Sequence, residues 1–237
     1  MYRSEGTYIK AEMKIAPIIF ENPSLLLLME RFGIEDAVQD KTVATICSEE
    51  SIECALFLSI INLYNGFIPE QSEKLNKGCI ETIIRFLKNS HNYYLEEKIP
   101  DIQNLIRSLF VANDIIEIRL IEKFFTEYSN EVKDHLSYED NIAFPYFYSL
   151  LGIPGQRPSE LNGFSAQEYK DHHTDIESKL TELKTLLIKY IPLKNSPAIK
   201  RKLLTSLFEL EYDLTIHSRI EELVLIPLIK KLENIIE

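Results

Sequence analysis

The spacing of apolar residues divides the chain into helical segments. In the second half of the sequence, apolar residues recur every three or four positions over long stretches, and strand-like alternation is almost absent. Glycine is excluded from these stretches, because all seven glycines lie near the chain ends or between periodic segments. The pattern predicts an all-α protein.

Four long helical segments are expected after residue 78. They cover residues 79–111, 114–151, 165–190 and 196 to the C-terminus. Pro100 predicts a kink or a break in the first segment, and the glycine-containing stretch 152–163 predicts a loop after the second. Ser165 and Glu168 form a capping pattern at the start of the third. Long amphipathic helices joined in this way pack as an up-down four-helix bundle.

A smaller helical module is expected ahead of the bundle. The polar stretch 66–78 has the composition of a linker, so we divide the chain into an N-terminal module at residues 1–70 and a bundle at residues 79–237. The module shows two or three short helices, one of which opens around Ser24 and ends at Gly33.

The three cysteines, Cys47, Cys54 and Cys79, do not have the spacing of a metal site. An odd number of cysteines without metal-site spacing indicates a reduced, cytoplasmic setting. A further helix of the module is expected to open at Ser48. If Cys47 and Cys54 both lie on that helix, they are separated by about 10 Å of helical rise, which is beyond the reach of a disulfide. We therefore predict that the module neither binds metal nor forms a redox disulfide.

The charge balance argues against two classes of partner. The formal net charge is -11, and an acidic surface repels both nucleic acid and anionic membranes. No stretch approaches the roughly 20 apolar residues that a membrane-spanning helix requires, and the first ten residues lack the apolar core of a secretory signal. We expect a cytoplasmic protein without a nucleic-acid or membrane partner.

The histidines carry the candidate chemistry, since all five fall in the four long segments and each segment has at least one. Two of them lie in matching frames. His135 is followed four residues later by Glu139, His217 is followed by Glu221, and in both frames a proline comes ten residues after the histidine. Residues four apart project from one face of a helix. Because the second and fourth helices of an up-down bundle run the same way, the two frames can present equivalent ligands to one site.

The other two helices supply His91 and, on the third, either His172 or His173. His173 shares an apolar stripe with Ile176 and Leu180, so we take it as the ligand. Imidazole and carboxylate together suit iron, and carboxylates can bridge two cations. We expect four histidines and two glutamates to bind two iron ions, with open positions for oxygen or nitric oxide.

These residues resemble the hemerythrin-like di-iron domain. The likeness rests on the frames at His135 and His217, each with its glutamate and proline, and covers residues 79–237. More closely, the chain resembles proteins that repair iron–sulfur centres after nitrosative or oxidative damage. The segments that begin at Glu21 (ENPSL) and Glu30 (ERFGI) are similar to the short domain that precedes the bundle in those proteins.

The resemblance implies how the ligands divide between the two irons. His91 and His135 would bind one iron, and His173 and His217 would bind the other. The two glutamates of the frames would bridge them. The chain departs from the family in two places: residues 35–39 stand where the family usually has neighbouring cysteines, and the first helix has one more residue than expected between its histidine and its proline.

The function implied by the resemblance is a cytoplasmic stress response in which damaged iron–sulfur clusters are restored, with iron–sulfur proteins as clients. Two alternatives would use the same centre. One is a sensor or carrier that binds oxygen or nitric oxide reversibly, and the other is an enzyme that reduces nitric oxide. The sequence leaves open whether the chain is an enzyme.

Overall fold

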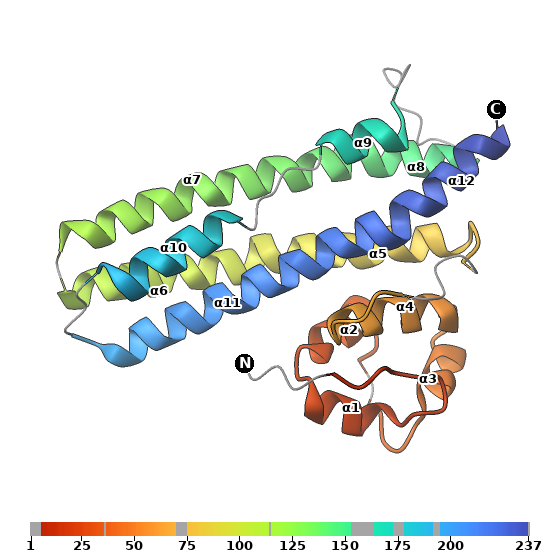
Figure 1. Cartoon of the computed structure of the whole chain (residues 1–237), viewed down its shortest axis with the longest axis horizontal. Coiled ribbons are helices and arrows are strands. Elements are labelled where there is room, and N and C mark those ends of the chain that lie inside the picture. The colour runs from red at the N-terminus through yellow and green to blue at the C-terminus, as the bar shows by residue number, and fades with distance from the viewer. Residues whose placement is uncertain are drawn as a thin grey trace. The chain divides into compact units, whose positions relative to one another are not determined.

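In its computed structural model, the described part of the chain is mostly helical (Figure 1). The residues that the structure describes are 6–35, 37–69, 75–113, 115–152, 164–172, 178–191 and 195–236. None of these residues forms a strand, and their one extended pairing is an isolated bridge between Lys14 and Thr42. No helix among them is long and apolar enough to cross a lipid bilayer. The all-α prediction is confirmed.

The chain groups into two compact units. Unit 1 consists of the described residues within Met1–Asn89, Tyr146–Lys170 and Ile216–Glu237. Unit 2 consists of the described residues within Ser90–Pro145 and Asp171–Thr215. This grouping does not test the boundary expected between module and bundle, which stays a prediction.

Unit 1 begins with four short helices: α1 (Ile15–Glu21), α2 (Leu25–Arg31), α3 (Val43–Glu49) and α4 (Cys54–Tyr64). Helix α2 begins and ends as predicted, and Gly33 after it has a φ of 78°, a conformation that favours glycine. The helix start predicted at Ser48 is wrong, because Ser48 lies in the last turn of α3 and α4 opens at Cys54. The cap of α3 is Thr42, whose Oγ1 accepts a hydrogen bond from the N–H of Thr45.

Helix α4 is buried along almost its whole length and fixes the N-terminal segment of unit 1. The Asn62 side chain accepts from the N–H of Ile9 at 2.7 Å and donates to the carbonyl of Ile9 at 2.9 Å. The Phe32 ring lies 5.1 Å from that of Phe57 in α4 and 4.9 Å from that of Phe86. These contacts give unit 1 a core that reaches beyond its first four helices.

The remainder of unit 1 comes from later segments of the chain. They are the part of α5 (Cys79–Asn92) up to Asn89, α8 (Phe144–Leu150) from Tyr146, α9 (Ala166–His172) up to Lys170, the end of α11 (Pro197–Ile220), the π turn η4 (Glu221–Leu225) and α12 (Ile226–Ile236). A carboxylate oxygen of Glu233 in α12 accepts from the N–H of Ala166 and from the Tyr146 hydroxyl, both at 2.8 Å. Ser165 Oγ accepts from the N–H of Glu168 at 3.2 Å, as its capping pattern predicts. These bonds fix the start of α9.

Four helices supply most of the described hydrophobic core of unit 2. They are α6 (Ile99–Asn113), α7 (Ile116–Tyr138), α10 (Ser178–Lys189) and α11 up to Thr215. The buried positions of α7 follow the predicted three- and four-residue spacing: Ile118, Ile121, Phe125, Tyr128, Val132 and Leu136. Two buried lysines, Lys98 and Lys184, form ion pairs with Glu209 and Glu211 of α11.

Among the described residues, three π turns interrupt the long helices: η2 (Tyr93–Lys98), η3 (Glu139–Ala143) and η4. Each is followed at once by an α-helix whose second residue is proline, at Pro100, Pro145 and Pro227. Proline offers no N–H to the preceding turn and its ring crowds it, so a wider turn ahead of the proline lets the helix continue. Pro100 therefore does not break the first segment, which is helical from Cys79 to Asn113.

Candidate metal centre

The π turns occur beside the predicted metal ligands. Turn η3 begins at Glu139, η4 begins at Glu221, and η2 begins two residues after His91. Each of the two glutamates thus lies where the helix widens, four residues after its histidine. Such turns are frequent at functional sites, because the extra residue redirects side chains that a regular helix would space evenly.

Glu139 is the centre of the ligand group in unit 2. Its side chain is fully buried (0% exposed), as is almost all of His91 and His135. His91 Nε2 lies 3.1 Å from one carboxylate oxygen of Glu139, and His135 Nε2 lies 3.1 Å from the other. Both imidazoles therefore face the same carboxylate.

The orientation of His91 is set by two side chains that sequence reasoning missed. Its Nδ1 lies 3.2 Å from Oδ2 of Asp140, and its ring stacks on Phe144 with centroids 5.7 Å apart and planes 17° apart. An imidazole whose Nδ1 faces a carboxylate is held with Nε2 directed at the other partner, here Glu139, as in the outer shells of metal sites. The position of Asp140, directly after a predicted ligand, was the one signal in the sequence.

Glu221 is the centre of the corresponding group in unit 1. It is also fully buried (0% exposed), and its Oε1 lies 3.4 Å from Nε2 of His217. The Tyr169 hydroxyl donates to the same oxygen at 2.7 Å. Tyr169 is buried and packs edge-on against Phe147, with centroids 5.4 Å apart. Sequence reasoning missed Tyr169, although it lies four residues before His173 in the sequence.

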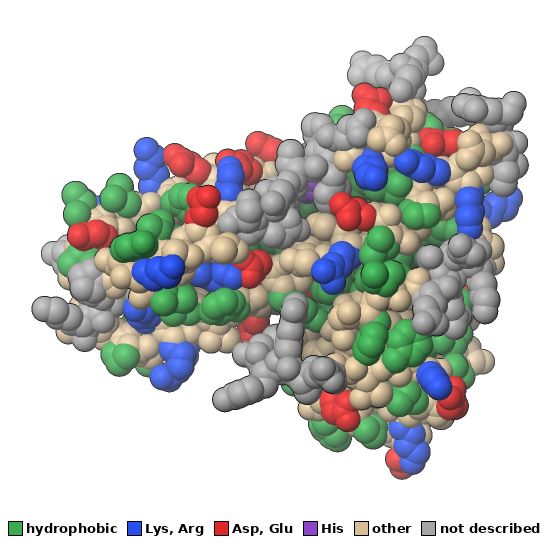
Figure 2. Space-filling view, viewed as in Figure 1, with side chains coloured by type: hydrophobic (Ala, Val, Ile, Leu, Met, Phe, Trp, Pro, Cys, Tyr) green, Lys and Arg blue, Asp and Glu red, His purple; other side chains and the backbone are tan. Residues whose placement is uncertain are grey.

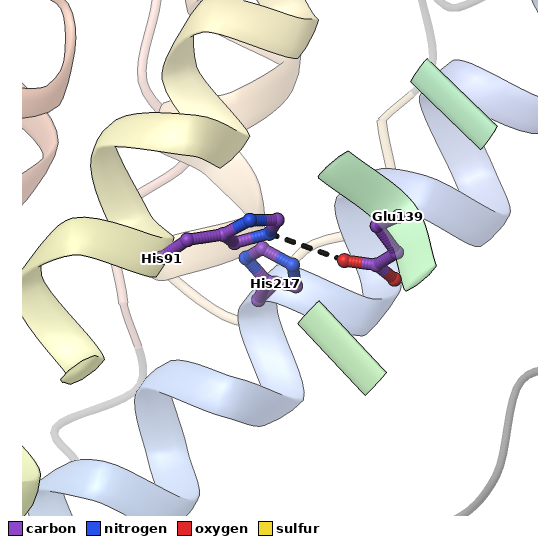
Figure 3. A group of neighbouring side chains, drawn as sticks. All are labelled: His91, Glu139 and His217. Atoms are coloured by element: carbon purple, nitrogen blue, oxygen red, sulfur yellow. Dashed lines mark ion pairs between the residues drawn. The ribbon is translucent and has the colours of Figure 1, made fainter. Parts of the chain in front are cut away.

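Ligand atoms of His91, Glu139 and His217 all lie within 4.8 Å of one another, which is close enough to hold a metal ion (Figure 3). This is the one group of three or more such donors in the part of the chain that the structure describes. His135 is in contact with Glu139, and Glu221 with His217. The predicted ligand His173 lies outside the described residues.

The donor set fits a transition-metal ion such as iron. Imidazole nitrogen and carboxylate oxygen are ligands that iron accepts together. A buried carboxylate is costly unless positive charge or hydrogen bonds compensate it, and a cation between Glu139 and the histidines would supply that charge. The site is enclosed, since His91, His135 and His217 are buried and almost no histidine surface is visible on the face drawn in Figure 2. The buried cluster of His91, Glu139 and His217 could hold a metal ion.

Comparison of the chain with protein-family models, with curated proteins and with solved structures found no match.

Removing the Tyr169 hydroxyl is expected to weaken metal binding. Tyr169→Phe keeps the ring packed on Phe147 and deletes the hydrogen bond to Glu221, so we expect iron affinity to fall about tenfold or more and the free energy of unfolding to fall by about 1.5–3 kcal/mol. Chelator competition measures the affinity, and denaturant unfolding measures the stability.

A matched control for Tyr169→Phe is Tyr146→Phe, which deletes another tyrosine–glutamate hydrogen bond of unit 1, the one to Glu233. The control should keep the iron affinity of the unmodified chain. Equal iron affinity in the two variants would show that Tyr169 does not position a metal ligand.

Proposed function

We propose that the chain is a di-iron protein whose four long helices form a hemerythrin-like bundle. The observation that carries the proposal is the repeated frame, because His135–Glu139 and His217–Glu221 each end in a fully buried glutamate at the first residue of a π turn. One such pair is common on helix surfaces, where it contributes a few tenths of a kcal/mol. Two buried copies, together with His91, are better explained by a shared cofactor.

In this proposal the glutamates bridge two iron ions, and the histidines complete the set. His91 and His135 would bind one iron, and His173 and His217 would bind the other. The two carboxylates would offset part of the charge of the paired cations, and Asp140 and Tyr169 would hold their partners in place. A centre of this kind supplies open coordination positions for a small diatomic ligand and the redox chemistry of iron.

We further propose that the protein takes part in the repair of iron–sulfur clusters damaged by nitrosative or oxidative stress. The support is the sequence resemblance, which extends from the bundle to the N-terminal segments at Glu21 and Glu30. The partners would be oxygen or nitric oxide at the metal centre and, as clients, damaged iron–sulfur proteins. The three cysteines, none of which forms a disulfide, agree with the cytoplasmic location that we propose.

The test is restoration of a damaged client. An enzyme that depends on a [4Fe–4S] cluster is inactivated with nitric oxide, freed of excess nitric oxide, and incubated with the iron-loaded chain. Recovery of its activity is expected with the unmodified chain and not with an iron-free Glu139→Ala chain. A matched amount of free ferrous iron shows how much recovery iron alone provides.

The same preparations separate the alternatives. If the iron-loaded chain restores no more activity than free iron, repair is contradicted. Reversible changes in its optical spectrum on adding and removing nitric oxide or oxygen would then favour a sensor or carrier. Continuous consumption of nitric oxide with an electron donor would favour a reductase.

A further inference from the structure

Two cysteines that are apart in sequence are brought together by a reversal of the chain between α3 and α4. Cys47 lies in α3, and Cys54 is the first residue of α4. The chain turns back at Ser51, where φ is 54°, and the N–H of Ile52 then donates to the carbonyl of Cys47 at 2.9 Å. The separation predicted from the sequence depended on both cysteines lying on one helix. That condition is not met, because α3 ends at Glu49 and α4 begins at Cys54.

The two thiols are neighbours, since Cys54 lies within hydrogen-bonding reach of the Cys47 side chain. Burial, and after it the neighbouring Cys54 thiol, raises the pKa of Cys47, so Cys47 is protonated at neutral pH. Cys47 is only 2% exposed, whereas Cys54 is half-buried and within reach of a small molecule in solution. The pair thus combines one accessible and one enclosed sulfur.

We propose that Cys47 and Cys54 form a redox-active dithiol that small disulfides oxidise to an intrachain disulfide. This inference is independent of the proposed metal centre, and it reverses our prediction from sequence that the module is redox-inert. Its substrate class is a low-molecular-weight disulfide such as oxidised glutathione.

The reaction is a thiol–disulfide exchange in two steps. The Cys54 thiolate, after losing its proton to solvent, attacks one sulfur of the small disulfide, forms a mixed disulfide and releases one small thiolate. Cys47 then loses its proton, attacks the Cys54 sulfur and releases the second small thiolate. The two protons lost by the cysteines balance those gained by the two small thiolates. Two protein thiols are oxidised to one disulfide, and one small disulfide is reduced to two thiols.

The third cysteine provides a matched control. Cys79, the first residue of α5, is as buried as Cys47, and burial followed by the charge of Glu53 raises the pKa of its thiol. It is buried without forming part of the proposed pair, so it should stay reduced when the pair is oxidised. Cys79→Ala therefore removes a buried thiol without removing the reaction.

The experiment treats the folded, full-length chain with oxidised glutathione, alkylates the remaining thiols and identifies them by mass spectrometry. We expect alkylation to fall from three cysteines to one, Cys79, with a peptide joining Cys47 to Cys54 and full recovery after reduction. Cys79→Ala should still form the disulfide. Cys54→Ser should form none, and its circular dichroism spectrum shows whether it is folded.

Three results would overturn the proposal. One is alkylation of all three cysteines after prolonged exposure to oxidised glutathione, when the circular dichroism spectrum shows a folded chain. The second is a disulfide that pairs Cys79 with either partner. The third is a Cys54 that keeps its mixed disulfide with glutathione while Cys47 stays reduced, since Cys47 would then not resolve it.

Discussion

Replacing Glu221 with alanine is expected to remove most of the iron that the protein binds. Glu221 is fully buried against His217 and Tyr169. In the proposed centre it bridges two cations, whose mutual repulsion rises when a bridging carboxylate is removed. Changes to groups that merely support a ligand cost about 10–100-fold in metal affinity, so loss of a bridging ligand should cost at least that much. Metal analysis after anaerobic iron loading and desalting measures the effect.

The adjacent residue supplies the control for Glu221. Glu222 is exposed and carries the same charge, so Glu222→Ala changes the net charge equally without touching the buried group. It should retain its iron. If Glu222→Ala lost as much iron as Glu221→Ala, the loss would reflect general charge or folding rather than coordination.

Glu139→Ala should resemble Glu221→Ala, because Glu139 faces both His91 and His135. His172→Ala should have a smaller effect, since the apolar stripe of the third helix favours His173 as the ligand. Similar iron loss in Glu139→Ala, Glu221→Ala and His172→Ala would show that the ligands are wrongly assigned.

Iron loading is expected to give about two ions per chain and to stabilise the fold. A ligand present at 100 times its Kd stabilises the folded state by about 2.7 kcal/mol, which for a chain of this size corresponds to a rise in Tm of roughly 5–11 °C. Tm is expected to rise because each cation would compensate buried carboxylate charge. Calorimetry with and without anaerobic ferrous iron measures it, and a chelator should reverse it.

Magnesium is the control for the thermal shift, because it prefers oxygen ligands and binds imidazole poorly. It should leave Tm almost unchanged. Less than one iron per chain, or an equal shift with magnesium, would contradict a dinuclear iron centre.

The sequence by itself determined the helical class, most of the helix positions and the residues that carry the candidate chemistry. Apolar spacing is a local property, and on α7 it predicted the buried face that the structure shows. The frames at His135 and His217 were also visible, because a ligand and its partner four residues away share one helix face. His91, the predicted ligand whose spacing to the next proline differs from the family it resembles, falls in the same group as Glu139 and His217.

The tertiary structure alone decided which side chains meet from different helices. Asp140 reaches His91, and Tyr169 reaches Glu221, through packing between elements that no spacing within one helix encodes. The sequence did not reveal the π turns either. A proline shows that the helical turn before it must change, but it does not show whether the helix continues after it. Cys47 and Cys54 show the same limit. The chain reverses at Ser51, a residue with positive φ, so the two cysteines lie on different helices with neighbouring thiols.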